Sequence, residues 1–64
     1  MRITYDSVAK AVYIRTMDVP EEFWIVAHTV ELEPNKIFID RTKNEEVYGI
    51  ELHEVDGITV EVLE

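Results

Sequence analysis

The sequence contains no cysteine, no glutamine, only two glycines and a single serine, Ser7. Without cysteine the chain has neither a disulfide nor a thiolate zinc site. Ser7 stands where a turn or helix cap is expected, which leaves no obvious nucleophile. Two glycines cannot build a phosphate-cradling loop, and so short a chain can scarcely enclose a pocket of several hundred Å³. We therefore expect no enzyme activity and no cofactor.

The sequence also has no long hydrophobic run. Met1 and Arg2 lead directly into an alternating segment, with no apolar core of a signal peptide. No apolar stretch approaches the ~18 residues that a membrane-spanning helix needs. We expect a cytoplasmic protein with no membrane contact.

Positive charge is scarce and unevenly placed. Six Lys and Arg stand against fourteen Asp and Glu, for a net charge of −8. Residues 1–43 hold all six bases and seven of the acids, whereas residues 44–64 hold seven acids and no Lys or Arg. This balance opposes direct binding to nucleic-acid phosphates or anionic lipids. The acidic last third predicts either a surface for a basic partner or a solvated face that keeps the protein soluble.

A chain of 64 residues with 47% hydrophobic content is one small folded domain, spanning residues 1–64. A domain of this size buries only about 60% of its unfolded surface, so its core is thin. Small domains compensate with disulfides, metals or oligomerisation. With disulfides excluded, we expect a homodimer.

Hydrophobic residues alternate with polar residues along most of the chain, which is the pattern of β-strands. Strands are expected at residues 3–5, 12–14, 23–32, 37–39, 47–55 and 58–62. Turn signals lie at Asp6-Ser7, 33–36, 42–45 and Asp56-Gly57, and Ser7 to Lys10 leaves room for at most one short helical turn. Connections this short exclude parallel crossovers. The prediction is an all-β, antiparallel meander of about five to six strands, folded as a curled sheet or sandwich.

The segment 23–32 is apolar on both faces in its first half. Such a strand is either central in the sheet or covered by a second copy. Phe23 and Trp24 are aromatic anchors of the kind that interfaces favour, and they are the candidate self-association residues. The alternative is that they simply fill the core. His28, on an otherwise apolar face of this segment, is expected inside the protein.

Three stretches, ITYDSVAKAVYIR (3–15), IFID (37–40) and VYGIEL (47–52), together resemble the domain of unknown function (DUF) 2283 family. The matching positions are Tyr5, Asp6, Tyr13, Ile14, Asp40, Gly49, Ile50 and Glu51. The resemblance implies a small β fold and no established activity. Some members lie beside genes for small toxins, which implies an antitoxin-like role for those members. This chain departs from many relatives at Lys10, at the hairpin 43–45 and at its strand-like end.

Two sets of side chains are candidates for chemistry. Asp6 and Glu51 could act as paired carboxylates, but the favoured interpretation is structural, with Asp6 forming a turn and Glu51 accepting hydrogen bonds. His28 and His53, with Glu31, Glu51 or Glu54, could hold a divalent metal, although no metal-ligand spacing is present. We expect no metal site.

The function expected from the sequence is therefore that of a non-enzymatic, antitoxin-like protein–protein interaction module. Its acidic side chains would meet a basic protein, with charge from Glu45, Glu46, Glu51, Glu54 and Asp56 and apolar anchoring from Phe23 and Trp24. Two alternatives remain open: an acidic mimic of nucleic acid, and a structural homo-oligomer with no other partner.

Overall fold

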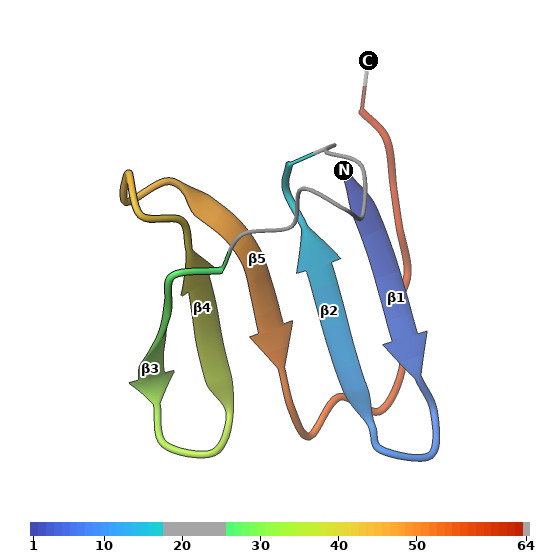
Figure 1. The fold of residues 1–64 in the computed structure, drawn as a ribbon. Helices are drawn as coiled ribbons and strands as arrows, with labels where there is room; N and C mark the ends of the chain where they lie inside the picture. The colour runs from blue at the N-terminus through green and yellow to red at the C-terminus, as the bar shows by residue number, and fades with distance from the viewer. Residues whose placement is uncertain (18–25, 64) are drawn as a thin grey trace.

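The computed structural model describes residues 1–17 and 26–63, and this part of the chain forms five strands and no helix (Figure 1). The strands are β1 (Arg2–Asp6), β2 (Ala11–Arg15), β3 (His28–Glu33), β4 (Ile37–Arg41) and β5 (Val47–Leu52). Among the described residues no helix has the length and apolar character needed to cross a membrane.

All neighbouring strands run antiparallel in one open sheet of order β1-β2-β5-β4-β3 (Figure 1). A β1–β2 hairpin and a β3–β4–β5 meander are joined where β5 pairs with β2. The prediction of a small antiparallel all-β fold is confirmed. The β2–β5 pairing joins the last strand of the hairpin to the last strand of the meander at the centre of the sheet.

The two faces of the sheet differ because residues directly opposite each other share a face. One row of aliphatic side chains crosses all five strands: Ile3, Ile14, Ile50, Ile39 and Val30. A second row on the same face contains Tyr5, Val12, Leu52 and Ile37. The other face carries Arg15, Gly49 and Asp40 in one row and Tyr13, Glu51 and Phe38 in the next. The strands therefore place a hydrophobic layer on one side and most of their polar groups on the other.

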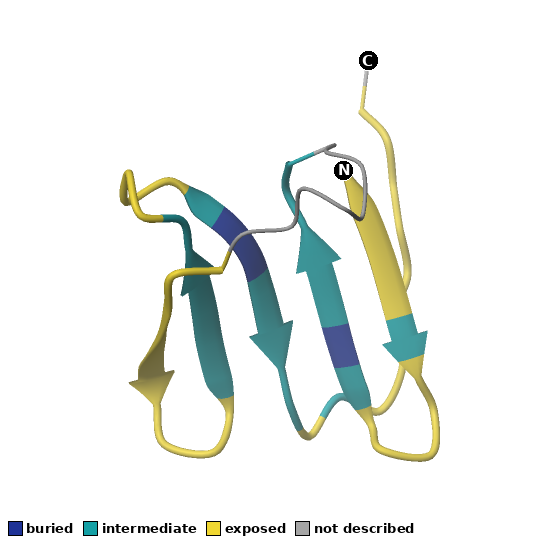
Figure 2. Cartoon of the chain, viewed as in Figure 1, coloured by how far each residue is buried: buried dark blue, intermediate teal, exposed yellow. Residues whose placement is uncertain are grey.

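Only a small part of this hydrophobic layer is buried. Among the described residues, the buried hydrophobic side chains are Val12, 4% exposed, and Tyr48, 3% exposed. They lie on β2 and β5, and Figure 2 shows burial confined to these two strands, with β3 and most of β1 exposed. The thin core that the chain length predicts is therefore found at the centre of the sheet.

Each hairpin is closed by local hydrogen bonds. Asp6 Oδ1 accepts from the backbone N–H groups of Val8 and Ala9, both at 3.0 Å, and so forms the β1–β2 turn. The β3–β4 turn contains a 3.0 Å bond from Lys36 N to Glu33 O. The β4–β5 loop is closed by Glu45 N bonding to Thr42 O at 3.0 Å. The turns predicted at these three places are confirmed, and the first forms no helix.

The predicted strand 23–32 is only partly correct. Its described portion becomes β3, which starts at His28, lies at an edge of the sheet and is exposed along its length. Of the two alternatives for this segment, the central position is not the one found, because β5 occupies it between β2 and β4. His28 is likewise exposed and not interior. Phe23 and Trp24 lie outside the described residues.

The predicted strands at 47–55 and 58–62 are also corrected. β5 ends at Leu52, after which His53 N bonds to Lys36 O at 2.8 Å and Val55 N bonds to Lys10 O at 2.9 Å. These bonds, with Glu54 at φ 62°, turn the chain out of the strand direction. Gly57 has no positive φ, which a two-residue hairpin turn of type I′ would require, and residues 58–62 form no strand.

Candidate functional site

The best-connected polar cluster joins Tyr13 on β2 to Asp40 on β4. The Tyr13 hydroxyl donates to Asp40 Oδ2 at 2.8 Å, and Thr29 Oγ1 on β3 donates to Asp40 Oδ1 at 2.6 Å. Strand β5 lies between β2 and β4, so the tyrosine must cross it. One carboxylate therefore links β2, β4 and β3.

Gly49 makes this crossing possible. Gly49 lies on β5, opposite Arg15 of β2 and Asp40 of β4, and the Tyr13 side chain passes over it. A Cβ atom at this position would overlap the hydroxyl and ring carbons of Tyr13. A glycine is needed here because an aromatic side chain covers the strand, and not because of a left-handed backbone.

Within the cluster, the Tyr13 hydroxyl acts as a hydrogen-bond donor. Desolvation raises the pKa of Tyr13 above its usual range, and the bond to Asp40 and the negative charge of that carboxylate raise it further. Tyr48 and Glu51 add smaller contributions in the same direction. Tyr13 therefore keeps its proton at neutral pH and holds Asp40 in place, which favours a structural role.

Asp6 and Glu51 do not meet. Asp6 lies on edge strand β1 opposite Ala11, whereas Glu51 lies on β5 opposite Tyr13, with β2 between the two strands. Glu51 instead lies 3.5 Å from His53 Nε2, and the His53 ring stacks edge-on against Phe38 with centroids 5.5 Å apart. The arrangement offers no paired carboxylates for acid–base work.

The two histidines lie at opposite ends of β4. His28 is opposite Arg41 at one end, and the backbone of His53 bonds to Lys36 at the other. Within residues 1–17 and 26–63, no three His, Asp or Glu side chains come together as metal ligands. Each imidazole instead contacts one glutamate, His28 the exposed Glu45 and His53 the half-buried Glu51.

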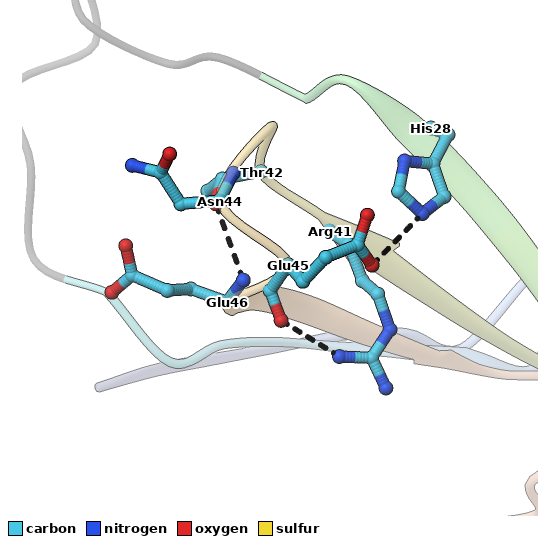
Figure 3. A network of polar contacts seen from close by, with 6 residues as sticks. All are labelled: His28, Arg41, Thr42, Asn44, Glu45 and Glu46. Carbon is cyan, nitrogen blue, oxygen red and sulfur yellow. Dashed lines mark hydrogen bonds and ion pairs between the residues drawn. The ribbon is translucent and has the colours of Figure 1, made fainter.

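The acidic side chains that follow β4 fall into two groups, at the two ends of β5. Figure 3 shows the first group, in the β4–β5 loop. The Glu45 carboxylate lies 3.5 Å from His28 Nε2, and its carbonyl accepts from Arg41 at 3.0 Å. The Glu46 N–H donates to Thr42 Oγ1 at 3.3 Å. The loop is therefore ordered by polar contacts that leave its carboxylates exposed.

The second group lies where the chain leaves β5. Glu54 pairs with Lys36 at 3.6 Å and Asp56 pairs with Lys10 at 3.1 Å. The side chains of Glu45, Glu54 and Asp56 remain 67%, 71% and 88% exposed. The predicted acidic residues therefore do not form one row, and four of them already contact a base of the same chain.

The Tyr13–Asp40–Thr29 connection is the feature that sequence reasoning missed. Tyr13, Asp40 and Gly49 each stand out as positions shared with a family, but their contact depends on β5 lying between β2 and β4. The signal in the sequence is a glycine in the middle of an otherwise β-favouring strand, VYGIEL, which indicates a close approach by another group.

The fold and the cluster define a small protein with one open sheet, in which the Tyr13 side chain crosses Gly49 and donates a hydrogen bond to Asp40. A family described as protein of unknown function (DUF2283) matches residues 2–55, and the chain belongs to this family. No curated protein and no solved structure matches the chain.

Proposed function

We infer that the protein is a non-enzymatic protein-interaction module that binds a basic partner chain. The observation that carries this proposal is the exposure of carboxylates in a segment, residues 44–64, that contains no Lys or Arg. A cytoplasmic location belongs to the same proposal.

The ion pairs of these carboxylates do not oppose partner binding. Exposed pairs of this kind contribute about 0–1 kcal/mol each. An arginine of a partner forms bidentate contacts with a carboxylate, so it can replace Lys10 at Asp56 or Lys36 at Glu54 at small cost. Charge complementarity of this type mainly increases the association rate and selects the partner.

The concrete form of the proposal is antitoxin-like. The protein would cover the basic, RNA-handling surface of a small toxin, by steric occlusion and by placing carboxylates where phosphates bind. Phe23 and Trp24 remain the candidate apolar anchors. An acidic nucleic-acid mimic is less favoured, because Glu45 and Glu46 lie at the opposite end of β5 from Glu54 and Asp56.

The test is affinity purification of the tagged protein from its host at increasing salt, with identification of co-eluting chains by mass spectrometry. We expect one basic chain to co-elute at low salt and to be lost as salt rises. The variants Glu45→Gln/Glu46→Gln and Glu54→Gln/Asp56→Asn should weaken its retention.

The matched control is Glu31→Gln/Glu33→Gln, which removes the same charge from β3 and should retain the partner. If the control loses the partner as much as the two test variants do, the effect is one of total charge, and the proposed surface is contradicted. Recovery of no second chain at low salt would favour the structural homo-oligomer.

A further inference from the structure

Residues 58–62 have the composition of a strand without a strand partner. Ile58, Val60 and Val62 alternate with Thr59 and Glu61, and β-branched residues favour a pleated, half-buried surface. The three aliphatic side chains are 45%, 62% and 82% exposed. This segment, here called the C-terminal strand segment, passes beside β1 in Figure 1, but no ladder joins the two. This alternating pattern is typical of a strand that pairs with the edge of a sheet.

The outer edge of β1 matches this pattern residue by residue. With Glu61 placed opposite Arg2 in an antiparallel pairing, Val60 falls opposite Ile3 and Thr59 opposite Thr4. Val60 then extends the aliphatic row that crosses the sheet from Ile3 to Val30. Ile3, 39% exposed at the end of that row, gains a neighbour.

Charge selects β1 over the other edge. β1 offers Arg2, with Arg15 opposite it on β2, to the single acid of the segment, Glu61. β3 presents Glu31 and Glu33 and has an irregular register between them. A second acidic strand beside β3 would meet like charge, whereas the same strand beside β1 meets opposite charge.

The exposed area leaves room for an interface with a second copy. The chain exposes 5035 Å², whereas a compact monomer of this mass exposes about 4,200 Å². The difference, roughly 800 Å², is the share of one partner in a stable interface of standard size. The segment also makes no ladder with the β1 of its own chain, where Tyr5 donates to Val55 O at 2.9 Å and holds the preceding residues on the apolar face.

We propose that two copies of this chain form a two-fold dimer in which the C-terminal strand segment of each copy pairs antiparallel with β1 of the other. The exchange is isologous, so it closes at two copies and leaves no open edge at β1. It adds a sixth strand to each sheet and covers the aliphatic side chains at that end.

The absence of native cysteine allows a direct test by disulfide trapping. The single variants Thr4→Cys and Thr59→Cys are mixed and oxidised mildly. Opposite strand residues have the Cα separation that a disulfide requires, so we expect the mixed disulfide to exceed the statistical half of the cross-linked product. Thr4→Cys mixed with Leu63→Cys is the off-register control and should cross-link less.

The double variant Thr4→Cys/Thr59→Cys separates the two possible origins of the segment. Linked dimers support exchange. A cyclised monomer, with no mixed disulfide between the single variants, would show that the segment pairs within its own chain and would overturn the proposal. Absence of both products would also overturn it.

Sedimentation velocity gives the second measurement. The wild-type protein should sediment at twice the chain mass of 7.5 kDa. Val60→Lys should raise the dimer dissociation constant at least about tenfold. Val8→Lys makes the same change at a valine that is 94% exposed in the β1–β2 turn, and it should leave the dimer intact. A monomeric wild type, or equal effects of Val60→Lys and Val8→Lys, would contradict the proposal. The variant Glu45→Gln/Glu46→Gln should not change the sedimenting mass.

Discussion

The centre of the sheet and its edges differ in what holds them. Strands β2 and β5 contain the buried Val12, Tyr48 and Gly49 (Figure 2). The Tyr13–Asp40 bond crosses β5 and joins β2 to β4. Edge strand β3 is exposed throughout, and β1 is exposed except at Tyr5. Stability is therefore concentrated at the centre, and the surfaces available for partners lie at the edges and in the acidic loops. Substitutions in the two regions should separate these roles.

The largest effect is expected from Gly49→Ala at the centre. The added Cβ must displace Tyr13, which both overpacks the sheet and breaks the bond to Asp40, at a cost of about 2–3 kcal/mol in the free energy of unfolding. Gly57→Ala is the matched control, because a Cβ there meets nothing within 4 Å. Urea denaturation at fixed protein concentration should show no loss for Gly57→Ala. Equal losses at the two glycines would contradict the role proposed for the Tyr13 side chain that crosses Gly49.

Two hydroxyl deletions compare the centre with the edge more finely. Tyr13→Phe leaves Asp40 without the donor at 2.8 Å, and we expect a loss of about 1–2 kcal/mol. Tyr5→Phe removes a 2.9 Å bond to Val55 O beside edge strand β1 and should cost about 0.5–1 kcal/mol. The same denaturation experiment measures both. A larger loss for Tyr5→Phe would place the main constraint at the edge.

The pH dependence of stability should carry a signature of Tyr13. Its pKa is raised in the folded state, by burial first and by Asp40 second, so the folded protein keeps a proton that the unfolded chain releases above about pH 10. The stabilising contribution is complete below that pH and is lost as pH rises further. Unfolding measured between pH 8 and 11 should show a steeper decline for wild type than for Tyr13→Phe. Parallel curves would contradict this linkage.

The sequence predicts the hairpins because their signals are local. Alternation in ITYD and AVYIR and the Asp6 turn define the β1–β2 hairpin, and similar signals define the β3–β4 and β4–β5 turns. The pairing of β2 with β5 is not local, and no turn specifies it. For that reason Tyr13, Gly49 and Asp40 were recognisable as singular residues, whereas their contact was not predictable.

The incorrect strand at residues 58–62 has a different cause. Its alternation is genuine, but a strand also needs a neighbour, and the pattern in one chain does not say which edge supplies it. For residues 23–32 the sequence leaves two alternatives open, a central strand or a strand covered by a second copy, for a related reason. Apolar residues on both faces indicate coverage without identifying what covers them.

At the β1 edge, Asp6→Ala should have a moderate effect. The substitution removes the acceptor of two backbone N–H groups in the β1–β2 turn and should cost about 1 kcal/mol. Asp6→Asn keeps an acceptor at the same place and should recover most of the loss. Thermal and urea unfolding of the two variants test this role, and equal losses would indicate that charge matters more than the turn bonds.

The smallest effect is expected at the Lys10–Asp56 ion pair near the same edge. The two side chains are 61% and 88% exposed, so solvent screens their attraction. Asp56→Asn should change the free energy of unfolding by at most about 0.5 kcal/mol, and the difference should vanish in high salt. The same substitution should still weaken partner retention when combined with Glu54→Gln, because that measurement depends on carboxylates presented to another chain. A loss above about 1 kcal/mol would mean that this contact holds the fold as the centre does, and would remove the distinction between the two regions.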